Sequence, residues 1–127
     1  MKRELILKKC DHCGAMVEVM QDCQCADCGL ICCGKPMRTI QSNSVDAAFE
    51  KHVPTYRRIE NQLLVTVNHV MDEDHYIEWV ALVTDNRVGK KFLQPGNSAE
   101  VLFPYVPNGT LYAYCNKHGL WKKEIEQ

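Results

Sequence analysis

The sequence predicts a mainly β protein in two parts: a small cysteine-rich module that a metal ion stabilises, followed by an antiparallel β-sandwich. Two observations predict this fold class. Seven of the eight cysteines lie within the first 33 residues, whereas four of the five histidines come after residue 50. In the second part, short runs with alternating apolar residues recur between turn-forming segments. We therefore assign residues 1–37 to the first domain and residues 38–127 to the second.

Composition restricts the compartment and the partners. A chain of 127 residues can bury one ordinary core plus a small appendage. With 15 basic and 16 acidic residues, the chain lacks the excess positive charge that nucleic-acid binding requires. Its first nine residues contain only three consecutive apolar side chains, too few for a signal peptide or a membrane span. We expect a cytoplasmic protein with reduced thiols that binds neither nucleic acid nor membrane.

The N-terminal module is predicted to contain two short strands, at residues 4–9 and 16–20, separated by cysteine-containing turns. It has few large apolar residues, so we expect it to fold only with its metal. A disulfide framework is the alternative for such a cysteine-rich segment. The C-x-x-C spacing of Cys10 and Cys13 opposes that alternative, as does the adjacency of Cys32 and Cys33, because adjacent cysteines rarely pair.

Residues 38–43 are expected to connect the two domains. Ser44 is a suitable N-cap for a short helix or turn over residues 44–51, which must end before Pro54 because a residue that precedes proline disfavours helical geometry.

The second domain begins with two runs of period-two alternation, which predict half-buried strands. One face of the first run carries Leu63, Val65, Val67 and His69. One face of the second run carries His75, Ile77, Trp79, Ala81 and Val83. Turn-forming segments then separate further strands at residues 88–93, 100–106 and 110–114. Short antiparallel strands at such intervals are typical of an immunoglobulin-like sandwich.

Four imidazoles and one thiolate occur in this second domain: His52, His69, His75, Cys115 and His118. Five ligands leave one position of a metal open, and an open position indicates chemistry whereas a filled shell indicates structure. Iron, copper and zinc suit such ligands. A blue-copper site is the rival interpretation, but it uses only two histidines and leaves the other two, and the N-terminal cysteines, unexplained. Iron fits the whole set better.

Several strings of residues resemble the signature segments of the superoxide reductases. They are Glu50-Lys51-His52-Val53-Pro54, His75-Tyr76-Ile77-Glu78-Trp79 and Tyr114-Cys115-Asn116-Lys117-His118-Gly119-Leu120-Trp121. Cys10-Asp11-His12-Cys13-Gly14 and Cys32-Cys33-Gly34-Lys35-Pro36-Met37 resemble the desulforedoxin module that is fused to them in desulfoferrodoxin. The resemblance spans nearly the whole chain.

The resemblance implies an iron enzyme that reduces superoxide to hydrogen peroxide by one electron. It makes His52, His69, His75 and His118 the equatorial ligands and Cys115 the axial ligand of the catalytic iron. Glu50 then matches the carboxylate that occupies the sixth site of the oxidised iron, and Lys51 the cation beside it. A Lys next to the open site attracts the superoxide anion. The resemblance also implies a rubredoxin-like electron donor and a homodimer. The alternative function is a non-catalytic electron-transfer protein, with iron or a blue-copper site, which would not require an open position beside Lys51.

The N-terminal metal centre departs from the family pattern. The resemblance gives Cys10, Cys13, Cys32 and Cys33 as the ligands of a second iron, in a rubredoxin-like or desulforedoxin-like module. The chain also has three further cysteines, Cys23, Cys25 and Cys28. Because Cys25 and Cys28 form a second C-x-x-C knuckle, they are alternative ligands. A zinc ion or an iron–sulfur cluster is therefore an alternative to the mononuclear iron.

Overall fold

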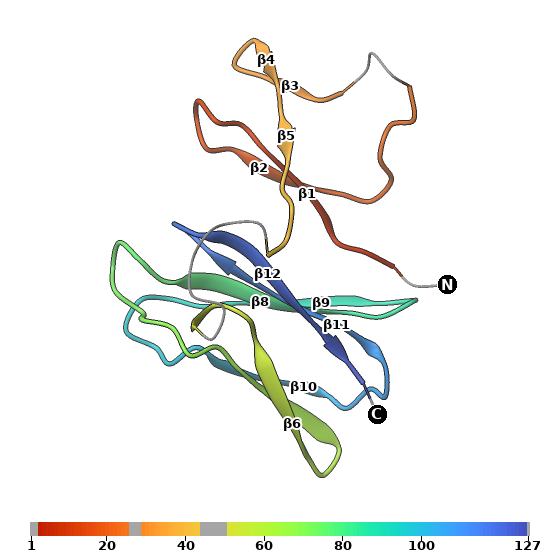
Figure 1. Cartoon of the computed structure of the whole chain (residues 1–127), viewed down its shortest axis with the longest axis vertical. Coiled ribbons are helices and arrows are strands. Elements are labelled where there is room, and N and C mark those ends of the chain that lie inside the picture. The colour runs from red at the N-terminus through yellow and green to blue at the C-terminus, as the bar shows by residue number, and fades with distance from the viewer. Residues whose placement is uncertain (1–2, 26–28, 44–50, 127) are drawn as a thin grey trace. The chain divides into compact units, whose positions relative to one another are not determined.

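The computed structural model describes residues 3–25, 29–43 and 51–126, and the elements named in these ranges are all β-strands (Figure 1). The chain divides into two compact units: Glu4–Gln41, and Ser42–Gln127 with Met1–Arg3. The division falls four residues later than the expected boundary after residue 37, because residues 38 and 39 form a strand of the first unit rather than a connection. Within the described ranges, no helix has the length and apolar character needed to span a membrane.

The N-terminal unit contains a three-stranded antiparallel sheet in the order β2-β1-β5. Its strands are β1 (Ile6–Lys9), β2 (Met16–Val19) and β5 (Arg38–Thr39). The expected strands at 4–9 and 16–20 are confirmed in position and are slightly shorter than predicted. Lys8 connects its own strand, β1, to β5 and to the segment that follows β2. Its ammonium group donates to the Thr39 hydroxyl at 3.0 Å and lies 3.3 Å from the Asp22 carboxylate.

A second small element of this unit is the hairpin β3 (Ile31–Cys32) and β4 (Lys35–Pro36). Only Cys33 and Gly34 connect its strands, and both have positive φ, 54° and 77°. Two consecutive residues with positive φ form the type I′ turn that suits the right-handed twist of a hairpin. The hairpin therefore bends back sharply at the adjacent cysteines.

The larger unit contains two antiparallel sheets, ordered β10-β7-β6 and β12-β11-β8-β9. The first comprises β6 (Thr55–Ile59), β7 (Gln62–Thr66) and β10 (Glu100–Pro104). The second comprises β8 (Ile77–Val83), β9 (Val88–Phe92), β11 (Gly109–Cys115) and β12 (Gly119–Ile125). Both sheets contribute to one apolar core, which confirms the predicted β-sandwich. The buried residues of that core are Leu63, Val65, Val67, Ile77, Val80, Leu82, Ala99, Val101, Phe103, Val106, Leu111, Ala113, Cys115 and Ile125.

A β-bulge in β8 corrects one sequence prediction. Ile77 pairs with Cys115 and Trp79 pairs with Tyr114, so Glu78 is an extra residue on the β8 side. Ile77 consequently points into the core with Val80 and Leu82, whereas Trp79 stacks on Tyr114 outside that cluster. The prediction that Ile77 and Trp79 share one face is wrong, because the bulge shifts the alternation by one residue. Strand β8 is also buried on both faces except at Glu78, as expected of a central strand.

Strands β6 and β12 were not predicted. Both lie at the edges of their sheets, and the exposed residues of β6 obscure an apolar alternation. A short loop of Glu60 and Asn61 joins β6 to β7, with Glu60 at φ 54°. The helix or turn predicted for residues 44–51 lies outside the described residues except for Lys51.

Candidate metal centres

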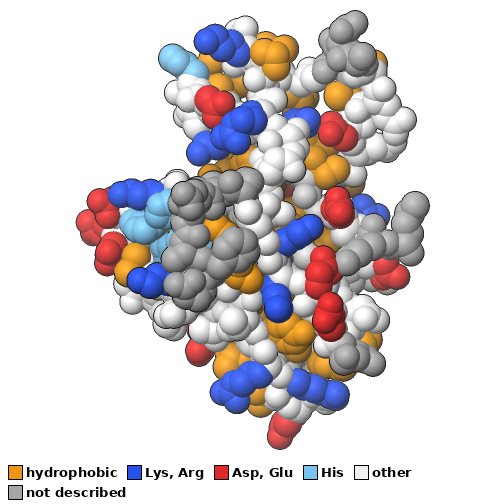
Figure 2. All heavy atoms as spheres, in the orientation of Figure 1, with side chains coloured by type: hydrophobic (Ala, Val, Ile, Leu, Met, Phe, Trp, Pro, Cys, Tyr) orange, Lys and Arg blue, Asp and Glu red, His pale blue; other side chains and the backbone are white. Residues whose placement is uncertain are grey.

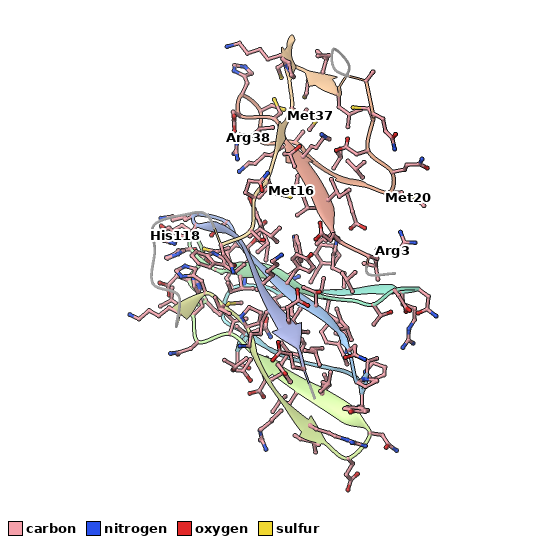
Figure 3. The ribbon with its side chains drawn as sticks, turned by 45° about the vertical axis from the view of Figure 1, so that its right-hand side comes forward. Arg3, Met16, Met20, Met37, Arg38 and His118 are labelled. Carbon is pink, nitrogen blue, oxygen red and sulfur yellow. The ribbon has the colours of Figure 1, made fainter. Side chains whose placement is uncertain are left out.

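The structure brings the five predicted donors of the sandwich together. His52, His69, His75, Cys115 and His118 each offer one ligand atom, and these atoms all lie within 4.8 Å of one another. His52 comes just before β6, His69 and His75 lie on the connection between β7 and β8, and Cys115 and His118 flank the turn between β11 and β12. Figure 2 shows a group of histidine side chains at the left of the view, with basic and acidic side chains beside it. Figure 3 labels His118 in this group.

The four imidazole rings form a closed ring of neighbours. Their centroids are 4.7 Å apart for His52–His69, 4.6 Å for His69–His75, 5.0 Å for His75–His118 and 4.9 Å for His118–His52. Each ring lies at 70° to 86° to the next one. Four rings in this cyclic order, each turned against its neighbour, direct one nitrogen apiece toward a common centre.

The distances between donor atoms fit a square of nitrogens. Nδ1 of His118 lies 3.1 Å from Nε2 of His52 and 3.3 Å from Nε2 of His75. Metal–nitrogen bonds of about 2.1 Å place neighbouring nitrogens of a square about 3.0 Å apart. The Cys115 sulfur is 3.4 Å from Nε2 of His69 and 3.8 Å from Nδ1 of His118, as expected of a fifth donor on one side of the square. The donor set therefore fits a five-coordinate metal with one open position.

Other contacts orient these donors. Nδ1 of His69 faces the carbonyl oxygen of Val70, which leaves its Nε2 directed at the other donors. His52 is buried and stacks on Trp121 with centroids 4.8 Å apart, and the Trp121 indole N–H donates to the carbonyl of His118 at 3.0 Å. Trp121 thus supports two ligand positions at once, which the sequence did not reveal.

The protonation states of His69 and His75 suit metal binding. Burial is the main cause that lowers the pKa of His69 and of His75, and neighbouring positive charges lower both further. Both rings are therefore neutral at neutral pH, which is the form that binds metals.

The second group of donors lies in the N-terminal unit. The sulfurs of Cys10, Cys13, Cys32 and Cys33 lie within 4.8 Å of one another. Sγ of Cys13 is 3.6 Å from Sγ of Cys32, and Sγ of Cys32 is 4.0 Å from Sγ of Cys33. A tetrahedral site with metal–sulfur bonds of about 2.3 Å has sulfurs about 3.8 Å apart. The four sulfurs therefore fit a filled tetrahedral metal site.

Backbone geometry shapes this second group. The type I′ turn presents Cys32 and Cys33, while Gly14, at φ 82°, closes the first knuckle by donating its N–H to the carbonyl of Cys10 at 2.9 Å. The backbone N–H of Cys13 faces the Cys10 sulfur and lowers the pKa of Cys10 to about 6. The side chains of Cys13 and Cys10 raise the pKa of Cys32 to about 12. The thiolate of Cys10 is thus favoured without metal, whereas Cys32, with its raised pKa, needs a nearby cation to stabilise its thiolate.

The remaining predicted residues are placed as follows. Cys25 is disulfide-bonded and Cys23 is an exposed thiol, and neither belongs to the four-sulfur group. Lys51 is exposed and directly precedes His52. Glu50 and Cys28 lie outside the described residues.

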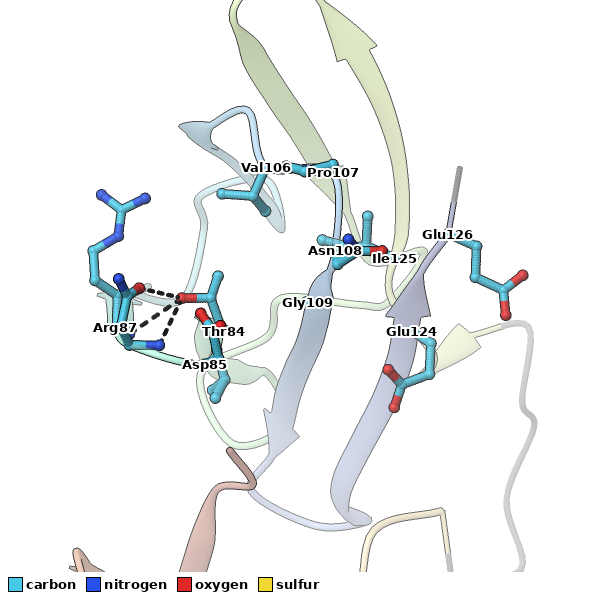
Figure 4. A pocket seen from close by; sticks show the side chains of 12 residues that line it. Thr84, Asp85, Arg87, Val106, Pro107, Asn108, Gly109, Glu124, Ile125 and Glu126 are labelled. Carbon is cyan, nitrogen blue, oxygen red and sulfur yellow. Dashed lines mark hydrogen bonds between the residues drawn. The ribbon is translucent and has the colours of Figure 1, made fainter. Parts of the chain in front are cut away.

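A cavity of about 670 Å³ lies at the other end of the sandwich, where β8 ends (Figure 4). The turn between β8 and β9, the segment before β11 and the end of β12 line it, including Arg87, Asn108 and Glu124. No imidazole or thiol is among its described lining residues, so it offers none of the soft donors found in the two metal centres.

This chain is similar to known proteins over nearly its whole length. A family model described as Desulfoferrodoxin matches residues 44–124, well over half of the chain. The chain belongs to the desulfoferrodoxin family. The desulfoferrodoxin of Syntrophotalea carbinolica is 40% identical over 130 residues, which cover 98% of this chain and 99% of that protein. The desulfoferrodoxin of Nitratidesulfovibrio vulgaris is 41% identical over 128 residues, with the same coverage.

Solved structures agree with this membership in the desulfoferrodoxin family. The superoxide reductase from Treponema pallidum is similar over 95% of this chain and 99% of its own, with a TM-score of 0.72 and 29% identity. The single-iron superoxide reductase from Giardia intestinalis is similar over 61% of this chain and 99% of its own, with a TM-score of 0.54 and 26% identity.

Proposed function

We propose that this desulfoferrodoxin is a superoxide reductase, which converts superoxide to hydrogen peroxide with one electron and two protons. The group of four imidazoles and one thiolate supports the proposal most directly, because five donors leave one position for a small substrate. A blue-copper electron carrier, the alternative function, needs only two imidazoles, whereas four surround the same point here.

In the proposed centre, iron would be held by His52, His69, His75, His118 and Cys115. Iron in this set would supply the single electron that superoxide takes up. The thiolate of Cys115 would donate electron density to that iron from a fully buried position, at 0% exposure, while His69, His75 and His118 are only half-buried. The sulfur is thus shielded from solvent, and superoxide would approach past the half-buried imidazoles.

Lys51 and Glu50 complete the proposed site. Superoxide is an anion, so the exposed ammonium group of Lys51 raises its concentration next to His52. The role we propose for Glu50, as a carboxylate ligand of the oxidised state, rests on its sequence position beside Lys51.

The N-terminal unit is proposed to bind a second iron through Cys10, Cys13, Cys32 and Cys33. Exposure of Cys13 and Cys33 supports electron exchange with a soluble donor, because electron transfer requires close approach. We propose a rubredoxin-like protein as that donor.

We also propose that the protein forms a homodimer and lies in the cytoplasm. Each chain would have two separate domains, one on either side of residues 37–41.

The reaction itself tests the function. Mixing the reduced protein with a known amount of superoxide should yield one hydrogen peroxide per superoxide, oxidise one iron each time and release no oxygen. Release of one oxygen for every two superoxide ions would identify a dismutase and overturn the proposal.

Lys51→Gln tests the attraction of the substrate. The variant should lower the second-order rate with superoxide about tenfold at low salt and flatten its dependence on ionic strength, because salt screens an attraction that the variant lacks. Lys123→Gln removes the same charge from an exposed position within β12 and is the matched control. If Lys51→Gln and Lys123→Gln lower the rate and its salt dependence equally, the net charge of the protein, rather than Lys51 itself, attracts the substrate.

A further inference from the structure

Asn116 lies between two of the proposed ligands, Cys115 and His118, and reaches across to the segment that carries a third. Its side-chain oxygen accepts a hydrogen bond from the backbone N–H of Tyr76 at 3.0 Å. Its side-chain N–H₂ group donates to the backbone carbonyl of Asp74 at 3.0 Å. One amide therefore binds the main chain on both sides of His75.

The backbone of Asn116 adds a third bond, because its N–H donates to the carbonyl of Tyr76 at 3.2 Å. The segment around His75 is itself folded back, with Asp72 and His75 exchanging backbone hydrogen bonds of 3.0 and 3.2 Å. That arrangement leaves the Asp74 carbonyl and the Tyr76 N–H for Asn116. The side chain and backbone of Asn116 thus join the segment around His75 to the turn between β11 and β12.

Only a side chain with a donor and an acceptor on one short planar group can make both contacts. Aspartate has the same size but two acceptors, so it would place a carboxylate oxygen against the carbonyl of Asp74. The position of Nε2 of His75, 3.3 Å from Nδ1 of His118, depends on how the loop sits against the turn. A loop that moves by a fraction of an ångström changes that separation directly.

We propose that Asn116 is a positioning residue, which fixes His75 relative to Cys115 and His118 and so sets the geometry of the metal centre. This inference rests on the metal centre of the proposed function. It concerns the affinity of that centre for its metal and the symmetry of the ligand arrangement. Asn116 contacts no donor atom through its side chain. Outer contacts of this kind commonly change metal affinity by about 10–100-fold.

Asn116→Asp is the sharpest variant, because it changes one donor into an acceptor and keeps the volume. Asn43→Asp is its matched control: Asn43 accepts from the Lys122 backbone N–H at 2.9 Å and its side chain lies 3.5 Å from the Lys122 carbonyl. It therefore makes the same kind of donor-and-acceptor pair in the same unit, but with the backbone of Lys122, which is not next to a proposed ligand in the sequence.

The full-length iron-loaded protein is the sample. Three measurements compare the variants: thermal unfolding, the electron paramagnetic resonance of the oxidised C-terminal iron, and competition for ferrous iron with a chelator. We expect Asn116→Asp to weaken iron binding about 10–100-fold and to change the resonance symmetry, while Asn43→Asp lowers the unfolding temperature without either effect.

Asn116→Ala repeats the test without an added charge, and it should weaken iron binding in the same direction. Unchanged iron affinity and resonance in both Asn116 variants would overturn the inference, and so would equal losses in Asn43→Asp. None of these measurements uses superoxide, so a negative result leaves the proposed catalytic function standing.

Discussion

Cys115 has no exposed surface, whereas Cys13 and Cys33 of the other centre are exposed. The Cys115 sulfur faces His69 and His118, and because it is buried it has no contact with solvent. Its place in the sandwich core, opposite Ile77, also means that the strand backbone fixes its position. The proposed thiolate ligand is therefore part of the core as well as part of the site.

Cys115→Ser should abolish the thiolate-to-iron charge-transfer absorption of the oxidised protein while the near-isosteric side chain preserves the fold. Hydroxyl oxygen is a harder and weaker donor than thiolate, so iron affinity should also fall by at least about tenfold. Optical spectra and iron analysis check both expectations. An unaltered absorption band would show that Cys115 is not the sulfur ligand.

Residue types and spacing were enough to name the five donors that the structure brings together in the sandwich. Spacing could not tell which ring nitrogen each histidine uses. His118 presents Nδ1 to its neighbours, whereas His52 and His75 present Nε2. That choice depends on side-chain rotamers and on contacts such as that of His69 with Val70, which arise only when distant segments meet.

At the scale of elements, the turn of Cys33 and Gly34 determines how the second pair of sulfurs is presented. Gly34 has a φ of 77° with open space around it, so only backbone strain opposes a side chain there. Gly34→Ala should destabilise the N-terminal unit by about 1 kcal/mol. Thermal loss of the N-terminal metal absorption measures the change.

Gly29→Ala is the control for this substitution, since Gly29 also has open space but no positive φ. It should leave the metal absorption and its thermal loss nearly unchanged. Equal destabilisation by both substitutions would show that the turn conformation is not the cause.

The prediction of strands from the sequence succeeded where apolar and polar residues alternate clearly. Strand β7 follows the predicted face of Leu63 and Val65, and these side chains are buried. The assignment of β8 residues to the two faces of the sheet failed at the bulge of Glu78. One extra residue reverses which side chains point to each face, without any change in composition. The prediction also failed for β5, whose two residues pair with β1 only because the chain returns to that sheet edge.

At the scale of the whole molecule, each of the two units contains its own group of donors. Cys13→Ser should remove the N-terminal metal and unfold that unit, which has few buried apolar side chains, while the C-terminal iron persists in its own core. Metal analysis and the two distinct absorption spectra check this.

Cys23→Ser is the matched control, because Cys23 is an exposed thiol outside the four-sulfur group. It should retain both metals. Loss of the N-terminal metal from this control would show that the additional cysteines supply ligands, and loss of both metals from Cys13→Ser would contradict the independence of the two units.

The closed ring of imidazoles has a consequence for how the protein matures. His52 and His118 meet across 66 residues of sequence, and His69 and Cys115 across 46. Contacts between such distant residues form late, after the entropy of closing long loops has been overcome. A nascent or partly folded chain therefore lacks the complete donor set. Iron loading should follow the slowest folding step, so that iron is captured firmly only by molecules whose sandwich is already complete.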